Sequence, residues 1–147
     1  MDTRVDFGSK EVSGALRAMI DLEKYISQAG LDRVLLDLVR LRASQINGCA
    51  FCIDMHWKDL RKEDQSEQRL YGLDAWRESP YYTDRERAAL AWTEAVTRVA
   101  DGHVPDEVFE EARQHFTEGE LVNLTMCLVA INGWNRLNIS FRTPAGT

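Results

Sequence analysis

The sequence predicts an all-α protein. Hydrophobic residues recur at three- and four-residue spacing along most of the 147 residues, and two pairs of helix-capping residues open later segments. No stretch alternates polar and apolar residues in the manner of a half-buried strand. A chain of this length can bury a core without disulfide cross-links, and we expect residues 1–147 to form one helical bundle domain.

Three helices are expected in the first half of the chain. The first has apolar residues spaced from Val12 to Ile26 and ends near Gly30, because glycine adopts the left-handed conformation that terminates helices. A second is marked by leucines and a valine over residues 31–41 and is interrupted by Asn47-Gly48. A third runs from about Cys49 to Lys62.

The second half begins with a short helix over residues 67–73 and an aromatic-rich loop over residues 74–82. Thr83 and Glu86 then have the spacing of a capping box, and the helix they open ends at Asp101-Gly102.

Two further helices complete the pattern. Pro105 begins the first of them. Thr117 and Glu120 form a second capping box, which opens a helix over residues 121–132. This last segment is apolar on nearly all sides, so we expect it in the core or in a subunit interface.

Composition excludes several functions. A net charge of −6 leaves no excess of basic residues to bind nucleic acid phosphates. The longest apolar run, residues 121–131, contains Asn123 and Thr125 and is too short to span a membrane. Three cysteines are too few for a secreted disulfide framework, and no apolar signal stretch follows Met1. We therefore expect a cytoplasmic protein.

The most informative pattern is a pair of thiols beside an imidazole. Cys49 and Cys52 are three residues apart, and His56 follows four residues later, so all three lie on one stripe of the expected helix. A thiol reacts as its thiolate, which a helix N-terminus and a neighbouring imidazole both favour. In a reducing compartment, this spacing indicates a catalytic or redox-active dithiol.

Two other interpretations of these residues stay open. A zinc site needs four ligands, and the remaining candidates, His103, His115 and Cys127, are isolated from one another along the chain. The three residues could also be small side chains in the core. Cys127, which lies within an apolar run, is expected to be a core residue for that reason.

The segment DLVRLRASQINGCAFCIDMH, residues 37–56, resembles the core motif of the alkylhydroperoxidase D-like branch of the carboxymuconolactone decarboxylase family. Residues 84–92 (DRERAALAW) and 131–136 (INGWNR) are also similar to that branch, so the likeness covers about residues 10–142. The resemblance implies a small all-helical subunit that assembles into trimers or hexamers. It also implies reduction of hydrogen peroxide or organic hydroperoxides through the CxxC pair, without haem, flavin or metal.

The same resemblance implies roles for four residues. Cys52 would attack the peroxide, Cys49 would resolve the product as a disulfide, and His56 with Asp37 would relay protons. Asp37 stands where the family usually has the longer glutamate, and Phe51 stands where some members have a second histidine. Either departure could slow peroxide reduction.

Alternatives to each of these roles stay open. From the residues alone, Asp37 could instead be a surface acid paired with the arginine three residues later. The chain could also be a thiol–disulfide oxidoreductase or a redox sensor, or less readily a lyase like the decarboxylases of the wider family. The partners expected are a hydroperoxide and a dithiol or protein reductant.

Overall fold

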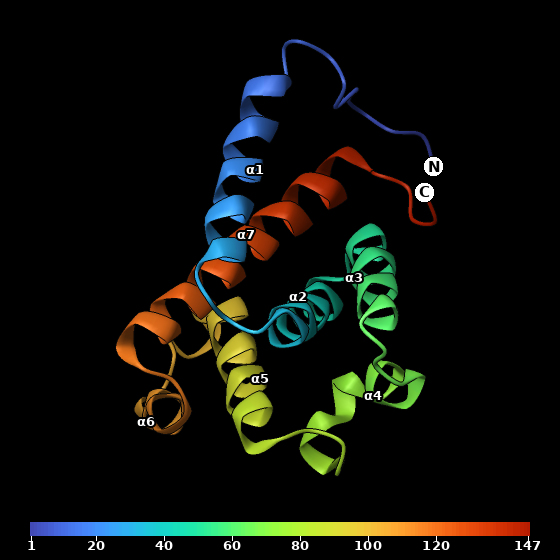
Figure 1. The fold of residues 1–147 in the computed structure, drawn as a ribbon. Helices are drawn as coiled ribbons and strands as arrows, with labels where there is room; N and C mark the ends of the chain where they lie inside the picture. The colour runs from blue at the N-terminus through green and yellow to red at the C-terminus, as the bar shows by residue number, and fades with distance from the viewer.

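The computed structural model describes residues 1–147 and contains only helices and the segments that join them (Figure 1). The predicted all-α class is confirmed. None of the helices is both long and apolar enough to cross a membrane. The elements are α1 (Ser13–Gln28), α2 (Arg33–Asn47), α3 (Ala50–Lys62), α4 (Glu67–Tyr71), the 3₁₀ helix η1 (Leu73–Glu78), α5 (Asp84–Thr97), the 3₁₀ helix η2 (Val99–Asp101), α6 (Asp106–His115) and α7 (Glu118–Phe141).

Helix α2 is the centre of the fold. It lies against α3, α5 and α7, and most of its residues from Leu35 to Ser44 are buried. A helix that is covered on all sides needs apolar residues around its whole circumference, and α2 supplies five leucines and valines within this stretch. Asp37 and Arg42 are also buried there, so α2 places charged groups inside the protein.

Helix α7 is longer than the sequence indicated. It begins after the capping box of Thr117 and Glu120, as predicted, but continues past residue 132 to Phe141. Gly133 does not end the helix. A Cβ atom at this glycine would lie 3.1 Å from the terminal carbon of Met19, so the missing side chain lets α1 approach α7 closely. Figure 1 shows α1 crossing α7 obliquely.

Two segments between the larger helices also differ from the prediction. The expected loop over residues 74–82 begins with η1, which buries Leu73 and Trp76. The indole of Trp76 donates a hydrogen bond to Glu94 on α5, and this contact orders the segment. Helix α5 ends at Thr97, and η2 completes the stretch up to Gly102, whose φ of 139° ends it.

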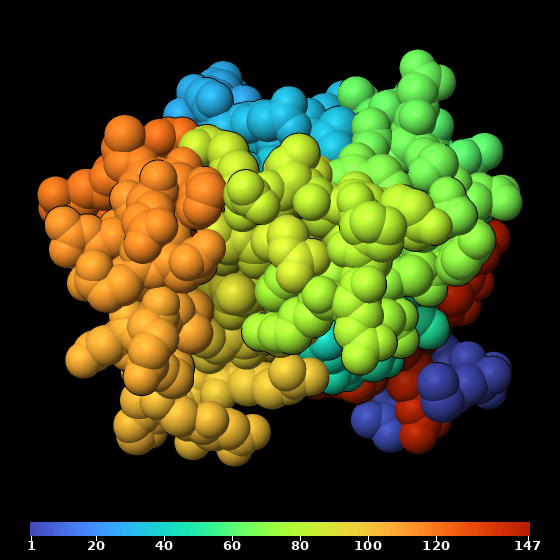
Figure 2. Space-filling model, turned by 90° about the horizontal axis from the view of Figure 1, so that it is seen from below, coloured from blue at the N-terminus to red at the C-terminus, as the bar shows by residue number.

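The two ends of the chain lie side by side (Figures 1 and 2). The backbone N–H of Arg4 donates to the carbonyl oxygen of Phe141, with a donor–acceptor distance of 3.0 Å. The rings of Phe7 and Phe141 pack edge to face with centroids 5.9 Å apart. These contacts bring Phe7 and Thr143 to the wall of the pocket described below.

Candidate functional site

The CxxC segment lies at the junction of α2 and α3. Helix α2 ends at Asn47-Gly48, where the sequence predicted an interruption, and Gly48 has the left-handed conformation with a φ of 71°. Cys49 is then the extended N-cap residue of α3, and its sulfur accepts a hydrogen bond from the backbone N–H of Cys52 at 3.3 Å. A helix N-terminus stabilises negative charge, so this position favours a thiolate at Cys49.

Cys49 and Cys52 are joined by a disulfide, with their Cα atoms 5.3 Å apart. Both residues are buried, with exposed fractions of 2% and 0%. Besides Cys49, Cys52 has a second polar neighbour, because the side-chain amide of Asn138 on α7 donates to the Cys52 sulfur at 3.7 Å. The pair therefore sits where α2, α3 and α7 meet.

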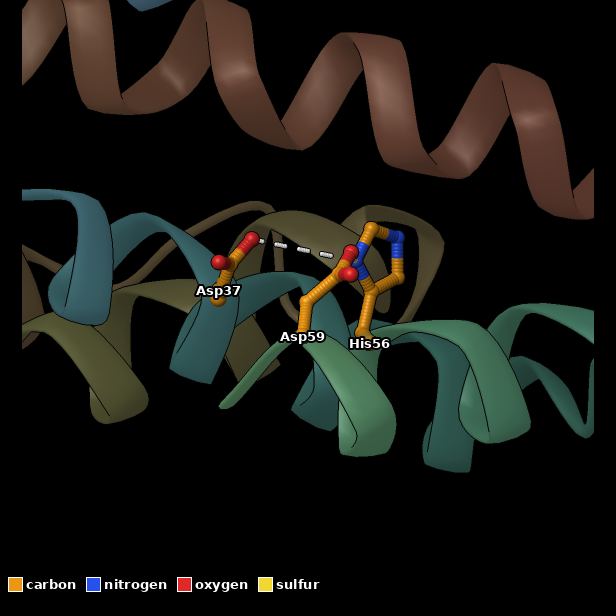
Figure 3. Close-up of side chains that lie close together, drawn as sticks. All are labelled: Asp37, His56 and Asp59. Carbon is orange, nitrogen blue, oxygen red and sulfur yellow. Dashed lines mark ion pairs between the residues drawn. The ribbon is translucent and has the colours of Figure 1, made fainter. Parts of the chain in front are cut away.

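His56 lies one turn beyond Cys52, and its imidazole faces two carboxylates. Nδ1 is 3.8 Å from Oδ1 of Asp37 on α2 and 3.9 Å from Oδ2 of Asp59 on α3. Figure 3 shows these three side chains converging from the two helices. Both separations exceed a hydrogen bond, and the buried Nδ1 atom has no hydrogen-bonding partner. A small side-chain movement would complete a bond to either acid.

Burial lowers the pKa of His56 to about 4, and the nearby Arg40 guanidinium adds to this effect while Asp59 opposes it. This value lies well below the ordinary imidazole pKa of 6.5. The imidazole is uncharged at neutral pH, because the interior solvates an imidazolium poorly. An uncharged ring can accept a proton, and either carboxylate beside it can stabilise the imidazolium that results.

Asp37 is buried, with an exposed fraction of 3%, and is not a surface acid. Arg40 does pair with it, as the alternative interpretation supposed, at 2.9 Å from Oδ1. The guanidinium of Arg33 lies 3.8 Å from the other carboxylate oxygen. Burial raises the pKa of Asp37, although both arginines act to lower it. Asp37 is thus a buried carboxylate held in place by two cations and directed at His56.

Arg40 extends this arrangement to two other helices. Its second nitrogen lies 2.9 Å from Oε2 of Glu23 on α1, and the indole of Trp134 on α7 donates to Oε1 of the same glutamate at 3.1 Å. The buried guanidinium is therefore shared by two carboxylates. This chain of contacts fixes the position of Asp37 relative to α1 and α7.

A pocket of about 1090 Å³ opens beside these residues, between α1, α2, α3, α7 and the two ends of the chain. Its polar side chains include Asp37, His56, Asp59 and Asn138. Neither cysteine lines it, but His56 and Asn138 connect its wall to the disulfide. The apolar part of the wall is formed by Phe7, Leu16, Ile20, Leu31, Leu36, Phe51, Met55 and Trp134.

The side chains of Asp37, His56 and Asp59 lie close enough together to be compared with a metal-binding site. One ligand atom from each of Asp37, His56 and Asp59 lies within 4.8 Å of the others. However, the Arg40 guanidinium already occupies Oδ1 of Asp37, the oxygen that faces His56, and its positive charge repels a cation. The donor set is better suited to moving a proton than to holding a metal ion.

Cys127 lies on α7 close enough to Arg40 for the guanidinium to act on its thiol, but it is not placed to react. It is buried within α7, and burial raises the pKa of its thiol to about 12. A protonated thiol is a poor nucleophile, which agrees with its expected place in the core.

Several residues at the site did not stand out in the sequence. Asp59 follows His56 by three residues on one helix, so its proximity could have been read from helical spacing. Glu23 on α1 and Trp134 and Asn138 on α7 are far from the CxxC segment along the chain. No local pattern links these three residues to it.

The family comparison covers more than half of the chain. A profile of the carboxymuconolactone decarboxylase family matches residues 13–95. The uncharacterized protein YdfG of Bacillus subtilis is 40% identical over 147 residues, which are 100% of this chain and 99% of that protein. The uncharacterized protein YnjA of Escherichia coli is 32% identical over 115 residues, which are 78% of this chain and 63% of that protein.

Solved structures show the same fold. A protein of unknown function from Agrobacterium tumefaciens, described as a candidate antioxidant defence protein AhpD, superimposes with a TM-score of 0.95. It is 44% identical, and the match covers 99% of both chains. A peroxidase-related protein from Silicibacter matches with a TM-score of 0.80 at 19% identity, covering 90% of this chain and 70% of that one. The debrominase Bmp8 in complex with 2,3,4-tribromopyrrole has a TM-score of 0.83 at 18% identity, over 93% of this chain and 73% of that one. At these low identities the last two show a shared fold only.

Proposed function

This chain belongs to the carboxymuconolactone decarboxylase family and to its alkylhydroperoxidase D-like branch, and we propose that it is a thiol-dependent peroxidase acting through Cys49 and Cys52. The observation that carries the proposal is the disulfide pair at the start of α3, one turn from an uncharged, buried imidazole that faces Asp37. This arrangement supplies a nucleophile, a second thiol that resolves the product, and a proton carrier.

In the proposed first step, the Cys52 thiolate attacks the distal oxygen of the hydroperoxide and the O–O bond breaks. The distal oxygen stays on Cys52 as a sulfenic acid, and the other oxygen leaves as an alkoxide that takes up a proton to form the alcohol. In the second step the Cys49 thiolate attacks the Cys52 sulfur, which forms the disulfide and expels hydroxide, and the hydroxide takes up the proton that Cys49 gave to His56 and leaves as water. Cysteines one helical turn apart can close this bond with little movement.

His56 is the proposed proton carrier for both steps. As an uncharged base it accepts the proton of the Cys52 thiol, and as an imidazolium it gives that proton to the departing alkoxide. A group whose pKa is about 4 holds a proton weakly, so His56 gives its proton readily to an alkoxide but takes one from the thiol less readily. Asp37 stabilises the short-lived imidazolium, and Arg40 keeps Asp37 directed at the ring.

The pocket supports a preference for organic hydroperoxides over hydrogen peroxide. Its volume of about 1090 Å³ and its mostly apolar wall suit a carbon chain or ring much larger than two oxygen atoms. Burying an apolar substituent contributes about 25 cal/mol per Å² of surface removed from water, a gain that hydrogen peroxide lacks.

The cycle closes when a dithiol reductant reduces the disulfide. Such a cycle requires a reducing compartment, so we place the protein in the cytoplasm. The test is consumption of an organic hydroperoxide by purified protein with a series of dithiol and protein reductants. We expect turnover that depends on both protein and reductant and is lost in Cys52→Ser. Full turnover by Cys52→Ser would contradict the proposal.

A second candidate is a thiol–disulfide oxidoreductase or redox sensor without efficient peroxide turnover. The long separation between His56 and Asp37 favours it, because a relay that is not hydrogen-bonded transfers protons slowly. Here the purified protein would exchange disulfides with a model dithiol at an appreciable rate but consume hydroperoxide no faster than free dithiol does. The same assay therefore separates the two candidates.

A further inference from the structure

Asn138 brings an amide group from α7 directly to a reacting sulfur. Its Nδ2 atom lies 3.7 Å from the sulfur of Cys52 and 2.9 Å from the carbonyl oxygen of Trp134, one turn earlier in the same helix. A side-chain amide nitrogen carries two hydrogens, so one N–H serves each acceptor. The bond to Trp134 fixes the amide and leaves its second N–H directed at Cys52.

This contact changes in strength with the state of the sulfur. A sulfur in a disulfide or a thiol is a weak acceptor, whereas a thiolate carries a full negative charge. Hydrogen bonds to ionised groups are roughly twice as strong as those between neutral groups. The amide of Asn138 therefore stabilises the thiolate form of Cys52 more than its protonated or oxidised forms.

The contact also bears on which cysteine is the better nucleophile. Cys49 is the N-cap of α3 and accepts the backbone N–H of Cys52 at 3.3 Å, so helix-end electrostatics favour a thiolate there. Cys52 lies inside the first turn and has no comparable backbone donor in the structure. Asn138 supplies a donor from another helix, and thereby offsets the advantage of Cys49.

We propose that Asn138 is a catalytic residue that lowers the thiol pKa of Cys52 by hydrogen-bonding its thiolate. The inference rests on the proposed function in one respect, the use of Cys52 as the attacking thiol. It adds a residue from α7 to a site that the CxxC segment and α2 otherwise provide. In the first step above, the thiolate that attacks the peroxide oxygen is the one to which Asn138 donates its hydrogen bond.

Other charged groups around the site come from different helices. Asp37 and Arg40 belong to α2, His56 and Asp59 to α3, and Glu23 to α1. Helix α7 contributes only the uncharged Trp134 and Asn138 to the pocket wall. Replacing Asn138 by leucine therefore alters no charge, and an altered thiol pKa reports the lost hydrogen bond.

The test measures the pH dependence of alkylation of Cys52 by iodoacetamide, with mass spectrometry to locate the modified residue. Cys49→Ser is the reference protein, and Asn138→Leu and Asn138→Asp are added to it. We expect the Cys52 pKa to rise by about one unit in the leucine variant, a tenfold loss of thiolate. It should rise further in the aspartate variant, whose carboxylate repels the thiolate. Aspartate has nearly the shape of asparagine, so it carries the test if leucine disturbs folding.

Two controls separate this role from a purely structural one. Asn132 makes the same one-turn bond, from Nδ2 to the Leu128 carbonyl oxygen at 2.9 Å, but touches no sulfur in the structure. Asn132→Leu should leave the Cys52 pKa unchanged. In a Cys52→Ser background, Asn138→Leu should leave the Cys49 pKa unchanged, whereas general loosening of the site would alter both thiols.

A Cys52 pKa that stays within about 0.2 unit of the reference in both folded Asn138 variants would overturn the inference. Alkylation consumes no peroxide, so its result is independent of the peroxidase assay. A failed peroxidase assay with a raised Cys52 pKa would reject the proposed function but keep the Asn138 contact. Peroxidase activity with an unchanged Cys52 pKa would support the proposed function but reject the role of Asn138.

Discussion

The Nδ1 atom of His56 lies 3.8 Å from Oδ1 of Asp37 and has no hydrogen-bonding partner. The family resemblance places a glutamate at this position, and the aspartate is one methylene shorter. The two atoms are therefore farther apart than a hydrogen bond allows.

We predict that Asp37→Glu closes this contact. A carboxylate hydrogen-bonded to Nδ1 stabilises the imidazolium, so the pKa of His56 should rise, which NMR titration of the ring protons measures. Asp37→Asn removes the charge and should lower the rate of peroxide reduction by about 10- to 100-fold. An Asp37→Asn variant with the wild-type rate would remove Asp37 from the relay.

The depressed pKa of His56 predicts a loss of stability in acid. Its folded pKa is about 4 and its ordinary value is 6.5, so between these values the unfolded chain binds more protons than the folded one. The contribution is fully present above pH 6.5 and is lost as the pH falls towards 4. The free energy of unfolding that is lost over this pH range is about 3 kcal/mol.

Denaturant unfolding at several pH values, with wild type and His56→Gln, measures this difference. The raised pKa of Asp37 contributes with the opposite sign, but Asp37 is present in both proteins and largely cancels. Equal acid sensitivity of the two proteins would show that His56 is not held uncharged by the fold.

Arg40 is predicted to be the costliest charged residue to remove. Arg40→Leu leaves the carboxylates of Asp37 and Glu23 without their shared cation, and breaking a buried ion pair in this way costs about 3–5 kcal/mol. The matched control is Arg113→Leu, because Arg113 makes one exposed pair with Glu110 and should cost less than about 1 kcal/mol. Urea unfolding of both variants provides the measurement, and equal losses would contradict the prediction.

The assembly of the protein is the fourth prediction. Val122 and Val129, two turns apart on α7, remain 57% and 53% exposed. We therefore propose that this exposed apolar side of α7 lies in or near a subunit interface, and the family resemblance implies trimers or hexamers. Sedimentation should give a homo-oligomer that Val122→Lys together with Val129→Lys weakens. A wild-type monomer of 16.8 kDa at micromolar concentration would contradict it.

Local signals in the sequence predicted the helices well. The capping boxes at Thr83 and Thr117 and the left-handed Gly48 act through neighbours within four residues, so their effects could be read directly. The end of α7 could not, because Gly133 lies inside the helix against Met19, a contact between residues that are far apart in the sequence.

The residues of the candidate site were predictable from local spacing and the family motif, but their contacts with distant helices were not. Cys49, Cys52 and His56 share one helix face, and the family motif adds Asp37, so the sequence pointed to all four. Their environment was not predictable from spacing. The low pKa of His56 comes from burial beneath packed helices, and the contacts of Glu23 and Asn138 cross from α1 and α7.

The most direct test of the account is a single-turnover measurement on the two cysteine variants. Reduced Cys49→Ser and Cys52→Ser are each mixed with one equivalent of an organic hydroperoxide, and the products are mapped by mass spectrometry. We predict that Cys49→Ser reduces one equivalent and stops as a trappable sulfenic acid on Cys52, while Cys52→Ser shows no burst. A burst in Cys52→Ser and none in Cys49→Ser would reverse the roles and show that the helix N-terminus at Cys49, and not the His56 relay with Asn138, selects the nucleophile.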